Sequence, residues 1–426
     1  MLNCACGGSI MLFSLYAPQF QTHLGYTQVQ VNTLSILGEA GMYMTTPIVG
    51  LCADLYGPGL MSIAASVLFA TAYLLAAWAY YAQLPYGAMM LAFLLIGCGT
   101  ASIYFGSVTA CAKAFTTNQG LSLSLPITAY GLSSLWQSQL VNALFIDHET
   151  EEVHVPQMFV FFAFFLAAVG AVSATGFYAS RPRRRSDADD EVPLLGETET
   201  PAPAPSPLEL VVEFASDRTV WAFALGLFMT TGPGEMFLNN MGSMIRSIGP
   251  GGPSIATNVS LISLFSAFFR ILTGAVSDYI AAPARGYSRV WLLLFFASLL
   301  AFGHFFVAFG GAYAEHGRFF WVASLSLGTG YGAIFTLAPT FVSLVWGVEH
   351  FGLNWGVLFI FPAVGSIVYE MLYATIYDAH THDGSLCFGL SCYAPTFYVT
   401  GLSCLAAIVT WVLVWEFAWK RRGIFV

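Results

Sequence analysis

Twelve long apolar segments follow one another along this chain, and they limit its fold more than any other feature. A helix needs about 20 mostly apolar residues to cross a lipid bilayer. The segments that meet this requirement cover residues 2–20, 31–52, 59–80, 86–111, 120–146, 157–179, 219–245, 255–279, 288–311, 318–346, 353–377 and 395–419. Hydrophobic residues make up 57% of the sequence and charged residues only 9%, which is too little charge to cover a soluble domain. The sequence therefore predicts an all-α polytopic membrane protein with twelve transmembrane helices.

A polar segment separates the first six of these helices from the last six. It contains Arg183-Arg184-Arg185, a run of acidic residues and a proline–alanine repeat that ends at Pro207. Such a composition cannot bury enough apolar surface to fold. We predict an N-terminal six-helix half at residues 1–180, a disordered linker at 181–218, and a C-terminal six-helix half with a short basic tail at 219–426. No basic residue precedes the first apolar segment, so it is expected to be a transmembrane helix and not a cleavable signal peptide.

Positive charge is distributed unequally between the two sides that these helices define. The side of the linker carries Lys113, Arg181, Arg183, Arg184, Arg185, Arg218, Arg285, Arg289, Lys420, Arg421 and Arg422. The opposite side carries only Arg246 and Arg318. Loops rich in Lys and Arg stay in the cytosol. The linker and both termini are therefore expected to be cytosolic.

Three pairs of short motifs occur in the same order in the two halves. They are Gly50-Leu-Cys-Ala-Asp54 with Gly274-Ala-Val-Ser-Asp278, Gly97-x-Gly99 with Gly328-x-Gly330, and Pro126 with Pro362. Small residues are common in membrane helices, so each pair alone is weak. Together they indicate two parallel repeats that enclose a binding site near the middle of the membrane.

The loop after the second helix resembles a known motif. Gly50-x-x-x-Asp54-x-x-Gly57 is similar to the signature loop between helices 2 and 3 of the major facilitator superfamily. The basic residues that usually follow are replaced by Pro58-Gly59-Leu60, so we expect a reduced charge relay through this loop. Together with Gly274 and Asp278, these residues are candidates for a motif that controls conformation.

Three other segments narrow the resemblance. They are Gly8–Pro18, Tyr130–Ser134 and Gly232–Gly242. These segments resemble the fungal monocarboxylate-transporter-homologue proteins of the nodulin-like branch of the superfamily, and the likeness extends over essentially the whole chain. The resemblance implies two six-helix halves in the major facilitator fold and a probable transporter of the fungal vacuolar membrane. It does not imply a monocarboxylate substrate.

Ionisable side chains inside a membrane are costly and usually face the interior of a helix bundle. Glu39, Glu235 and Glu370 fall in the half of the membrane opposite the linker, whereas Arg270 falls about 12 Å from the linker-side end of its helix. We expect the three acids to bind substrate or a coupling ion, or to stabilise a gate by hydrogen bonds. We expect Arg270 to bind a carboxylate or phosphate of the substrate, or to pair with Asp278 or an acid of the other half.

The seventh helix is expected to be interrupted beside Glu235. Thr231-Gly-Pro-Gly234 removes one backbone hydrogen bond and permits bending. Interrupted helices point to binding sites in transporters, although a plain kink gives the same pattern. Asn239 and Asn240 follow and are further candidates to face the cavity, whereas His304 is expected to be a packing residue.

No pattern typical of an enzyme occurs in the sequence. It contains no HExxH, no P-loop and no GxSxG with a plausible triad, so we expect no catalytic site, no cofactor and no ATP-driven step. Cys4-x-Cys6 and His380-x-His382 lack further ligands for a metal, whereas Cys387 and Cys392 are candidates for a disulfide. The net charge of -9, with no basic patch, excludes nucleic acid as an expected partner.

The linker contains one candidate sorting signal. Asp190-Glu-Val-Pro-Leu194-Leu195 fits the acidic dileucine form, which sorting adaptors read in an exposed segment. With the family resemblance, it predicts a vacuolar membrane protein with an adaptor as partner.

The most concrete hypothesis from the sequence is a secondary transporter. It would move small polar or anionic solutes across the bilayer by alternating access, with protons as the candidate coupling ion. The alternative is a non-transporting sensor or scaffold on the same fold.

Overall fold

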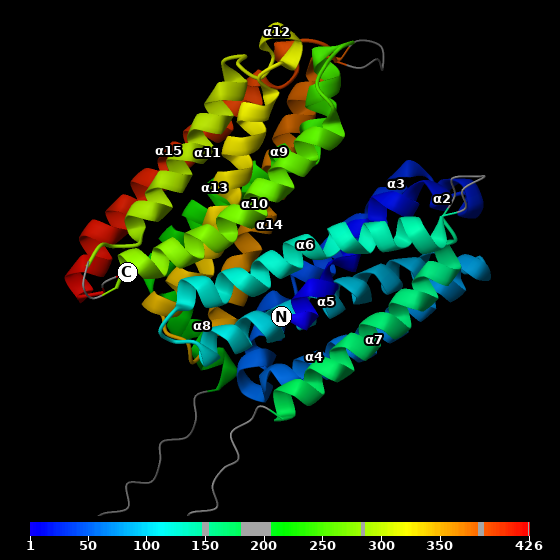
Figure 1. Cartoon of the computed structure of the whole chain (residues 1–426), viewed down its shortest axis with the longest axis horizontal. Coiled ribbons are helices and arrows are strands. Elements are labelled where there is room, and N and C mark those ends of the chain that lie inside the picture. The colour runs from blue at the N-terminus through cyan, green and yellow to red at the C-terminus, as the bar shows by residue number, and fades with distance from the viewer. Residues whose placement is uncertain (147–152, 180–205, 283–285, 382–386, 425) are drawn as a thin grey trace, which may run out of the picture.

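The computed structural model describes residues 1–146, 153–179, 206–282, 286–381, 387–424 and 426, and most of them are helical (Figure 1). The elements of the first half are α1 (Leu2–Cys6), η1 (Gly7–Leu12), α2 (Phe13–Leu24), α3 (Gln28–Tyr43), α4 (Thr46–Tyr81), α5 (Tyr86–Ala114), α6 (Gln119–Phe145) and α7 (Val155–Ala179). The first transmembrane span consists of α1, η1 and α2 end to end. The second consists of α3 and the first turns of α4.

A single glycine separates the second span from the third. Gly57 has φ 82° and ψ 169° and forms a kink inside α4. A side chain disfavours this conformation, so a glycine is required where the chain changes direction. The rest of α4, from Pro58 to Tyr81, is the third span.

The second half begins with a short helix outside the bundle. Its elements are α8 (Pro207–Ser216), α9 (Arg218–Ile248), α10 (Ile255–Ile280), α11 (Val290–Ala308), α12 (Ala314–Gly317), α13 (Phe320–Val345), α14 (Phe351–Ala379), η2 (Leu390–Cys392), α15 (Ala394–Val414), η3 (Trp415–Trp419) and η4 (Lys420–Arg422).

The prediction of twelve spans is confirmed within the described residues. By length and composition alone, eight helices there are long and apolar enough to cross a membrane. One of these, Val29–Tyr81, contains two spans because of the kink at Gly57. Residues 2–24, α6 and α9 do not meet those limits, but they pack inside the two bundles as the remaining three spans.

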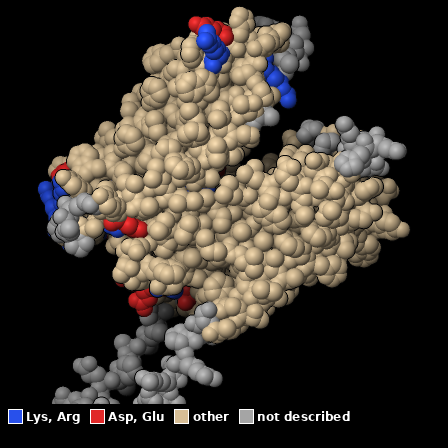
Figure 2. All heavy atoms as spheres, viewed as in Figure 1, with Lys and Arg blue, Asp and Glu red and all other residues tan. Residues whose placement is uncertain are grey.

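The two bundles touch on one side and diverge on the other (Figure 1). We call the side where α7 ends and α8 begins the linker side, and the side where α12 lies the far side. Across the contact, α4 packs along α14 and α6 packs along α10. Figure 2 shows a recess between the bundles that opens toward the far side, with charged side chains at the ends of the bundles and an uncharged surface between them.

The last part of the expected disordered linker is helical, so that prediction is wrong for residues 207–216. The Ser206 hydroxyl accepts a hydrogen bond from the Glu209 amide, and the Glu209 carboxylate accepts one from the Ser206 amide. This capping box satisfies the first free N–H groups of α8. Leu210 and Phe214 are buried, and the Phe214 ring lies edge-on to Trp346 at 5.5 Å. The apolar face of α8 therefore docks on the bundle, which the polar composition of the linker had obscured.

A disulfide closes a short loop on the far side. Cys387 and Cys392 are joined, as the sequence had left open. The Gly389 amide donates a hydrogen bond to the Ser247 carbonyl at 2.9 Å, which ties the loop to the end of α9. His382 lies outside the described residues. Within those residues, no three metal-ligating side chains cluster.

Candidate functional site

A buried carboxylate closes the linker side where α4 meets α14. Asp54 Oδ2 accepts a hydrogen bond from the Leu353 amide at 2.8 Å, at the N-terminus of α14. The Lys113 ammonium at the end of α5 lies 2.7 Å from Asp54 Oδ1, and the Asp54 side chain is only 2% exposed. A carboxylate is favourable at a helix N-terminus, where free N–H groups point outward. Asp54 thus links the N-terminal half to a helix of the C-terminal half.

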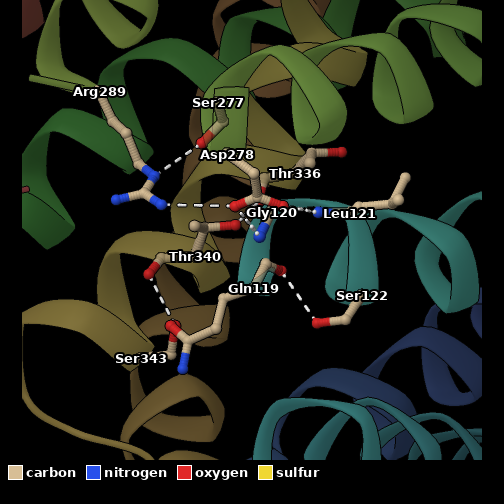
Figure 3. Close-up of polar contacts among 10 residues, drawn as sticks. All are labelled: Gln119, Gly120, Leu121, Ser122, Ser277, Asp278, Arg289, Thr336, Thr340 and Ser343. Carbon is tan, nitrogen blue, oxygen red and sulfur yellow. Dashed lines mark hydrogen bonds and ion pairs between the residues drawn. The ribbon is translucent and has the colours of Figure 1, made fainter. Parts of the chain in front are cut away.

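The second half repeats this arrangement with the roles of the halves exchanged (Figure 3). Asp278 at the end of α10 accepts hydrogen bonds from the amides of Gly120, at 2.9 Å, and Leu121, at 2.8 Å. These amides lie at the N-terminus of α6. Arg289 lies 3.4 Å from Asp278 and also donates to the Ser277 hydroxyl. The two aspartates of the repeated motif therefore occupy equivalent positions.

These contacts correct two expectations. The cation beside Asp54 is not missing, since Lys113 from α5 replaces the basic residues absent after Gly57. Arg270 does not pair with Asp278, which is occupied by backbone amides and Arg289. Arg270 and Asp278 are eight positions apart along α10, which corresponds to about 12 Å, too far for a direct pair.

Glycines let the helices approach closely at both crossings. A β-carbon at Gly50 would overlap the carbonyl oxygen of Gly352 in α14. A β-carbon at Gly274 would lie 2.5 Å from the carbonyl oxygen of Gly120 in α6. Neither position tolerates a larger residue while the halves are in contact, which explains the glycines that precede both aspartates.

The closed contact ends in a floor of aromatic rings. Tyr43 of α3 stacks on Phe359 of α14 at 5.3 Å. Phe359 in turn lies 5.7 Å from Tyr104 and 6.1 Å from Phe335. Tyr331 lies 4.8 Å from Phe335. The rings come from both halves and separate the linker-side contact from the recess above it.

Three carboxylates meet above this floor. Glu370 accepts hydrogen bonds from Asn239 at 2.6 Å and from Ser366 at 2.7 Å. Glu235 accepts one from the Tyr331 hydroxyl at 3.0 Å. Glu39, from the other half, accepts none from any described residue and interacts electrostatically with Glu370 and Glu235. The structure thus gathers acids that lie on three helices and in two halves.

Arg270 lies at the same depth as the aromatic floor. Its Nη1 donates to the Ile127 carbonyl at 3.1 Å, about 10 Å further along α6 than Gly120. The guanidinium carbon lies 5.7 Å from the centre of the Phe335 ring. Its Nε is buried without a hydrogen-bond partner, and no described acidic side chain forms an ion pair with it. The expected ion pair with an acid of the other half is therefore not present among the described residues.

The remaining candidate residues from the sequence do not belong to this group of acids. The amide of Asn240 donates to the Met236 carbonyl of its own helix at 2.9 Å. His304 is buried, and its Nδ1 lies 3.0 Å from the Thr400 hydroxyl, as expected for packing. Asp190, Leu194 and Leu195 lie outside the described residues.

The seventh helix is not interrupted, contrary to expectation. α9 runs from Arg218 to Ile248 with Pro233 inside it. Gly232 packs on Gly365 of α14, and Gly234 packs on Tyr331. The two glycines thus serve close packing, and the surrounding helices hold α9 in one piece despite the proline.

The sequence did not reveal several partners in this site. Lys113, Arg289 and Tyr331 each reach a carboxylate from a different helix. The Ser343 hydroxyl of α13 donates to Gln119 of α6, a further link between the halves (Figure 3). The only available signal was position, because Tyr331 directly follows Gly328-x-Gly330 and Gln119 is the first residue of α6.

The geometry is that of two helical repeats around a shared cavity, and the comparison with known families agrees. The model of the Major Facilitator Superfamily matches residues 1–369. The chain belongs to the Major Facilitator Superfamily. As a facilitator it is a membrane transporter and not an enzyme, as predicted.

Within this superfamily the facilitator groups with fungal MCH-type proteins. The probable transporter mch1 of Neurospora crassa is 32% identical, and the alignment covers 100% of this chain and 90% of that protein. The probable transporter MCH1 of Yarrowia lipolytica is 33% identical, with coverage of 100% and 92%. The resemblance seen in the sequence is confirmed.

Solved facilitators share the fold. FucP in the outward conformation is 14% identical with a TM-score of 0.62 and covers 95% of this chain and 96% of its own. XylE, a proton:xylose symporter bound to 6-bromo-6-deoxy-D-glucose, is 12% identical with a TM-score of 0.65, with coverage of 98% and 93%. At these identities the likeness establishes the fold alone.

Proposed function

We propose that this facilitator is a secondary transporter that moves small polar or anionic solutes across the vacuolar membrane by alternating access, coupled to protons. One observation carries the proposal. Glu39, Glu235 and Glu370, from both halves, interact electrostatically with one another, and Arg270, at the depth of the aromatic floor below them, forms no ion pair with a described acid.

The two closed crossings support the proposal of alternating access. Asp54 and Asp278 hold the N-terminus of a helix in the opposite half, so the linker side opens only when both contacts break. The same movement would bring α3 toward α9 and α14 and close the far side. A solute bound between the acids and Arg270 would then face the other compartment.

Protons are the proposed coupling ion because of the carboxylates. Three acids close together in a low dielectric cannot all stay charged cheaply. An acidic lumen on the far side would protonate them, and protonation would relieve their repulsion and favour far-side closure. The acids would then release protons to a neutral cytosol on the linker side. The solved neighbours XylE and FucP are named as proton symporters, which supports this proposal.

The vacuolar location is supported by the sorting segment Asp190–Leu195 and by what the family resemblance in the sequence implies. Positive charge on the linker side supports a cytosolic linker, which an adaptor could read. Replacement of Leu194 and Leu195 by Ala is expected to move the protein to the cell surface or endosomes in fluorescence microscopy. Unchanged vacuolar location would remove the adaptor from the proposal.

The transport proposal is tested in two steps. First, vacuoles isolated from yeast with and without the chain are compared for their small-molecule content. Second, uptake of the solute that differs is measured in proteoliposomes against lumenal pH, with Glu39→Gln, Glu235→Gln and Glu370→Gln.

The pH profile is expected to flatten in at least one variant. The matched control is Glu315→Gln, because Glu315 is a far-side acid outside the recess that pairs with Arg318. A pH profile that survives all three cavity substitutions would exclude proton coupling through these acids. Vacuoles with identical contents would favour the sensor or scaffold alternative.

A further inference from the structure

Two charged groups of opposite sign, one from each half, lack a charged partner of opposite sign among the described residues. Glu39 accepts no hydrogen bond from a described residue, although it faces Glu370. Arg270 has one backbone carbonyl as partner, a buried Nε with none, and no ion pair with a described acid. The other two acids differ, because Glu370 and Glu235 each accept hydrogen bonds from neighbours.

Arg270 is half-buried with a fully buried Nε, so its missing partner is costly unless a ligand satisfies it, whereas the exposed Glu39 carboxylate is accessible to a ligand. The Arg270 guanidinium has donors left in a planar fork that matches a carboxylate. A carboxylate of the solute would therefore satisfy Arg270. A proton could neutralise Glu39, but a proton gains no attraction from the adjacent aromatic rings. A cationic nitrogen group would pair with Glu39 and be attracted to the same rings.

The two unpaired groups lie at opposite ends of the aromatic floor. Arg270 lies against Phe335, which leads through Phe359 to Tyr43. Glu39 lies one helical turn, about 6 Å, beyond Tyr43 on α3. The ring centres along this path are 6.1 Å and 5.3 Å apart. The charges of a solute that reaches both ends are therefore separated by several bonds, with an apolar middle over the rings.

We infer that the cavity selects zwitterions, in which a positively charged nitrogen group pairs with Glu39 and a carboxylate pairs with Arg270 across an apolar spacer. This inference rests on the proposed transport function and names its substrate class. It also assigns the net charge of the bound solute, since a zwitterion brings no net charge into the closed cavity. Glu235 and Glu370, which already have hydrogen-bond partners, stay available for protons.

Matched pairs of ligands test this inference directly. The pairs are glycine with acetate, 4-aminobutyrate with butyrate, and 6-aminohexanoate with hexanoate, and each pair differs by one amino group. Hexylammonium provides the cation alone. Binding to the full chain in lipid nanodiscs is measured by tryptophan fluorescence, since Trp355 lies 5.2 Å from Phe359 in the floor.

We expect 4-aminobutyrate or 6-aminohexanoate to bind at least tenfold more tightly than its matched acid. Glycine, with its charges on adjacent carbons, should show no such preference. Glu39→Gln should abolish the preference for the amino compound and leave the affinity for the acid unchanged. Arg270→Gln should weaken both members of the pair and spare hexylammonium. Glu315→Gln, on the far-side surface, should change none of these values.

Three results would overturn the inference. Equal binding of every amino acid and its matched acid would mean that a proton, and not an ammonium group, neutralises Glu39. The proposed transport function would be unaffected by that result. A preference that survives Glu39→Gln would place the ammonium group elsewhere. A lack of binding by the whole series would also overturn the inference. The proposed transport function is tested separately, by the comparison of vacuole contents.

Discussion

At the scale of single residues, the ionisable groups of the candidate site differ in whether other side chains bind them. Glu235 and Glu370 are held by Tyr331, Asn239 and Ser366, so their positions are set before any ligand arrives. Arg270 is held only by the Ile127 carbonyl and the face of Phe335. Under the proposed function, the solute completes the contacts of the Arg270 guanidinium, whereas Glu235 and Glu370 already have hydrogen-bond partners.

Arg270→Lys tests whether the planar fork of this residue is needed. Lysine keeps the charge but cannot donate two parallel hydrogen bonds to a carboxylate. A hydrogen bond to a charged group contributes about 1.5–3 kcal/mol, so we expect the apparent affinity in transport to fall by about tenfold or more. Expression should be unchanged on an immunoblot. Normal transport by Arg270→Leu would contradict any role of this residue in solute binding.

Asp217 lies outside the membrane spans, and its carboxylate stays charged across the physiological pH range. Partial burial alone would raise the pKa of Asp217, but hydrogen bonds from Arg422, the Thr219 amide and Trp346 outweigh it and lower the pKa to about 2. A lowered pKa stabilises the fold above the usual value of 3.8, and this stabilisation is lost as pH falls toward 2.

Asp217→Asn should therefore lower the melting temperature by the same amount at every pH from 5 to 8. The difference between variant and wild type should shrink only below about pH 4. Thermal unfolding in detergent across this range checks the prediction. A difference that changes between pH 5 and pH 8 would show that Asp217 titrates there after all.

At the scale of elements, two helix crossings determine which side is closed. The α4–α14 and α6–α10 crossings each combine a glycine contact with an aspartate at a helix N-terminus. Each crossing joins a helix of one half to a helix of the other half, so neither half alone can close the linker side. Close approach of the backbones is what brings each aspartate within hydrogen-bond distance of amides in the other half.

Gly50→Ala and Gly274→Ala should both weaken linker-side closure. Overpacking of this kind costs about 1–3 kcal/mol, enough to shift a two-state population by about tenfold. The shift is measured as a shorter distance between spin labels at Leu144 and Glu315, which lie exposed at the far ends of the two halves. Gly87→Ala is the matched control, because a β-carbon there meets nothing within 4 Å. Equal distances in all three variants would mean that the glycine contacts do not govern closure.

At the scale of the whole molecule, the structure represents one state of the proposed cycle. The two crossings close the linker side, and the bundles diverge toward the far side, where a recess lies between them (Figures 1 and 2). Under the proposed proton coupling, charge repulsion among Glu39, Glu235 and Glu370 would favour this state, because far-side closure would bring the acids still closer. Protonation of the acids would then act on the equilibrium between states and not only on the proposed binding site.

Acidification from pH 8 to pH 5 is expected to shorten the distance between the labels at Leu144 and Glu315. The triple variant Glu39→Gln, Glu235→Gln, Glu370→Gln should show the short distance at both pH values, since its amides carry no charge to repel. Double electron–electron resonance in nanodiscs provides the measurement. If the wild-type distance is the same at both pH values, the acids do not control far-side closure.

The sequence by itself determined the number of spans, the repeat and the family. Bilayer thickness sets the length of an apolar helix whatever its neighbours are, so these features can be read one segment at a time. The membrane depth of Glu39, Glu235, Glu370 and Arg270 could be estimated for the same reason.

Only the tertiary structure decided how these residues are paired. Lys113 reaches Asp54 and Tyr331 reaches Glu235 from helices distant in sequence. Such contacts depend on the rotation and tilt of each helix, which packing sets and hydropathy does not encode. The same holds for α9, which is continuous through Pro233 and packs there on a neighbouring helix, with Gly232 against Gly365. Depth in the membrane is a property of one helix, whereas a binding site is a property of several helices in contact.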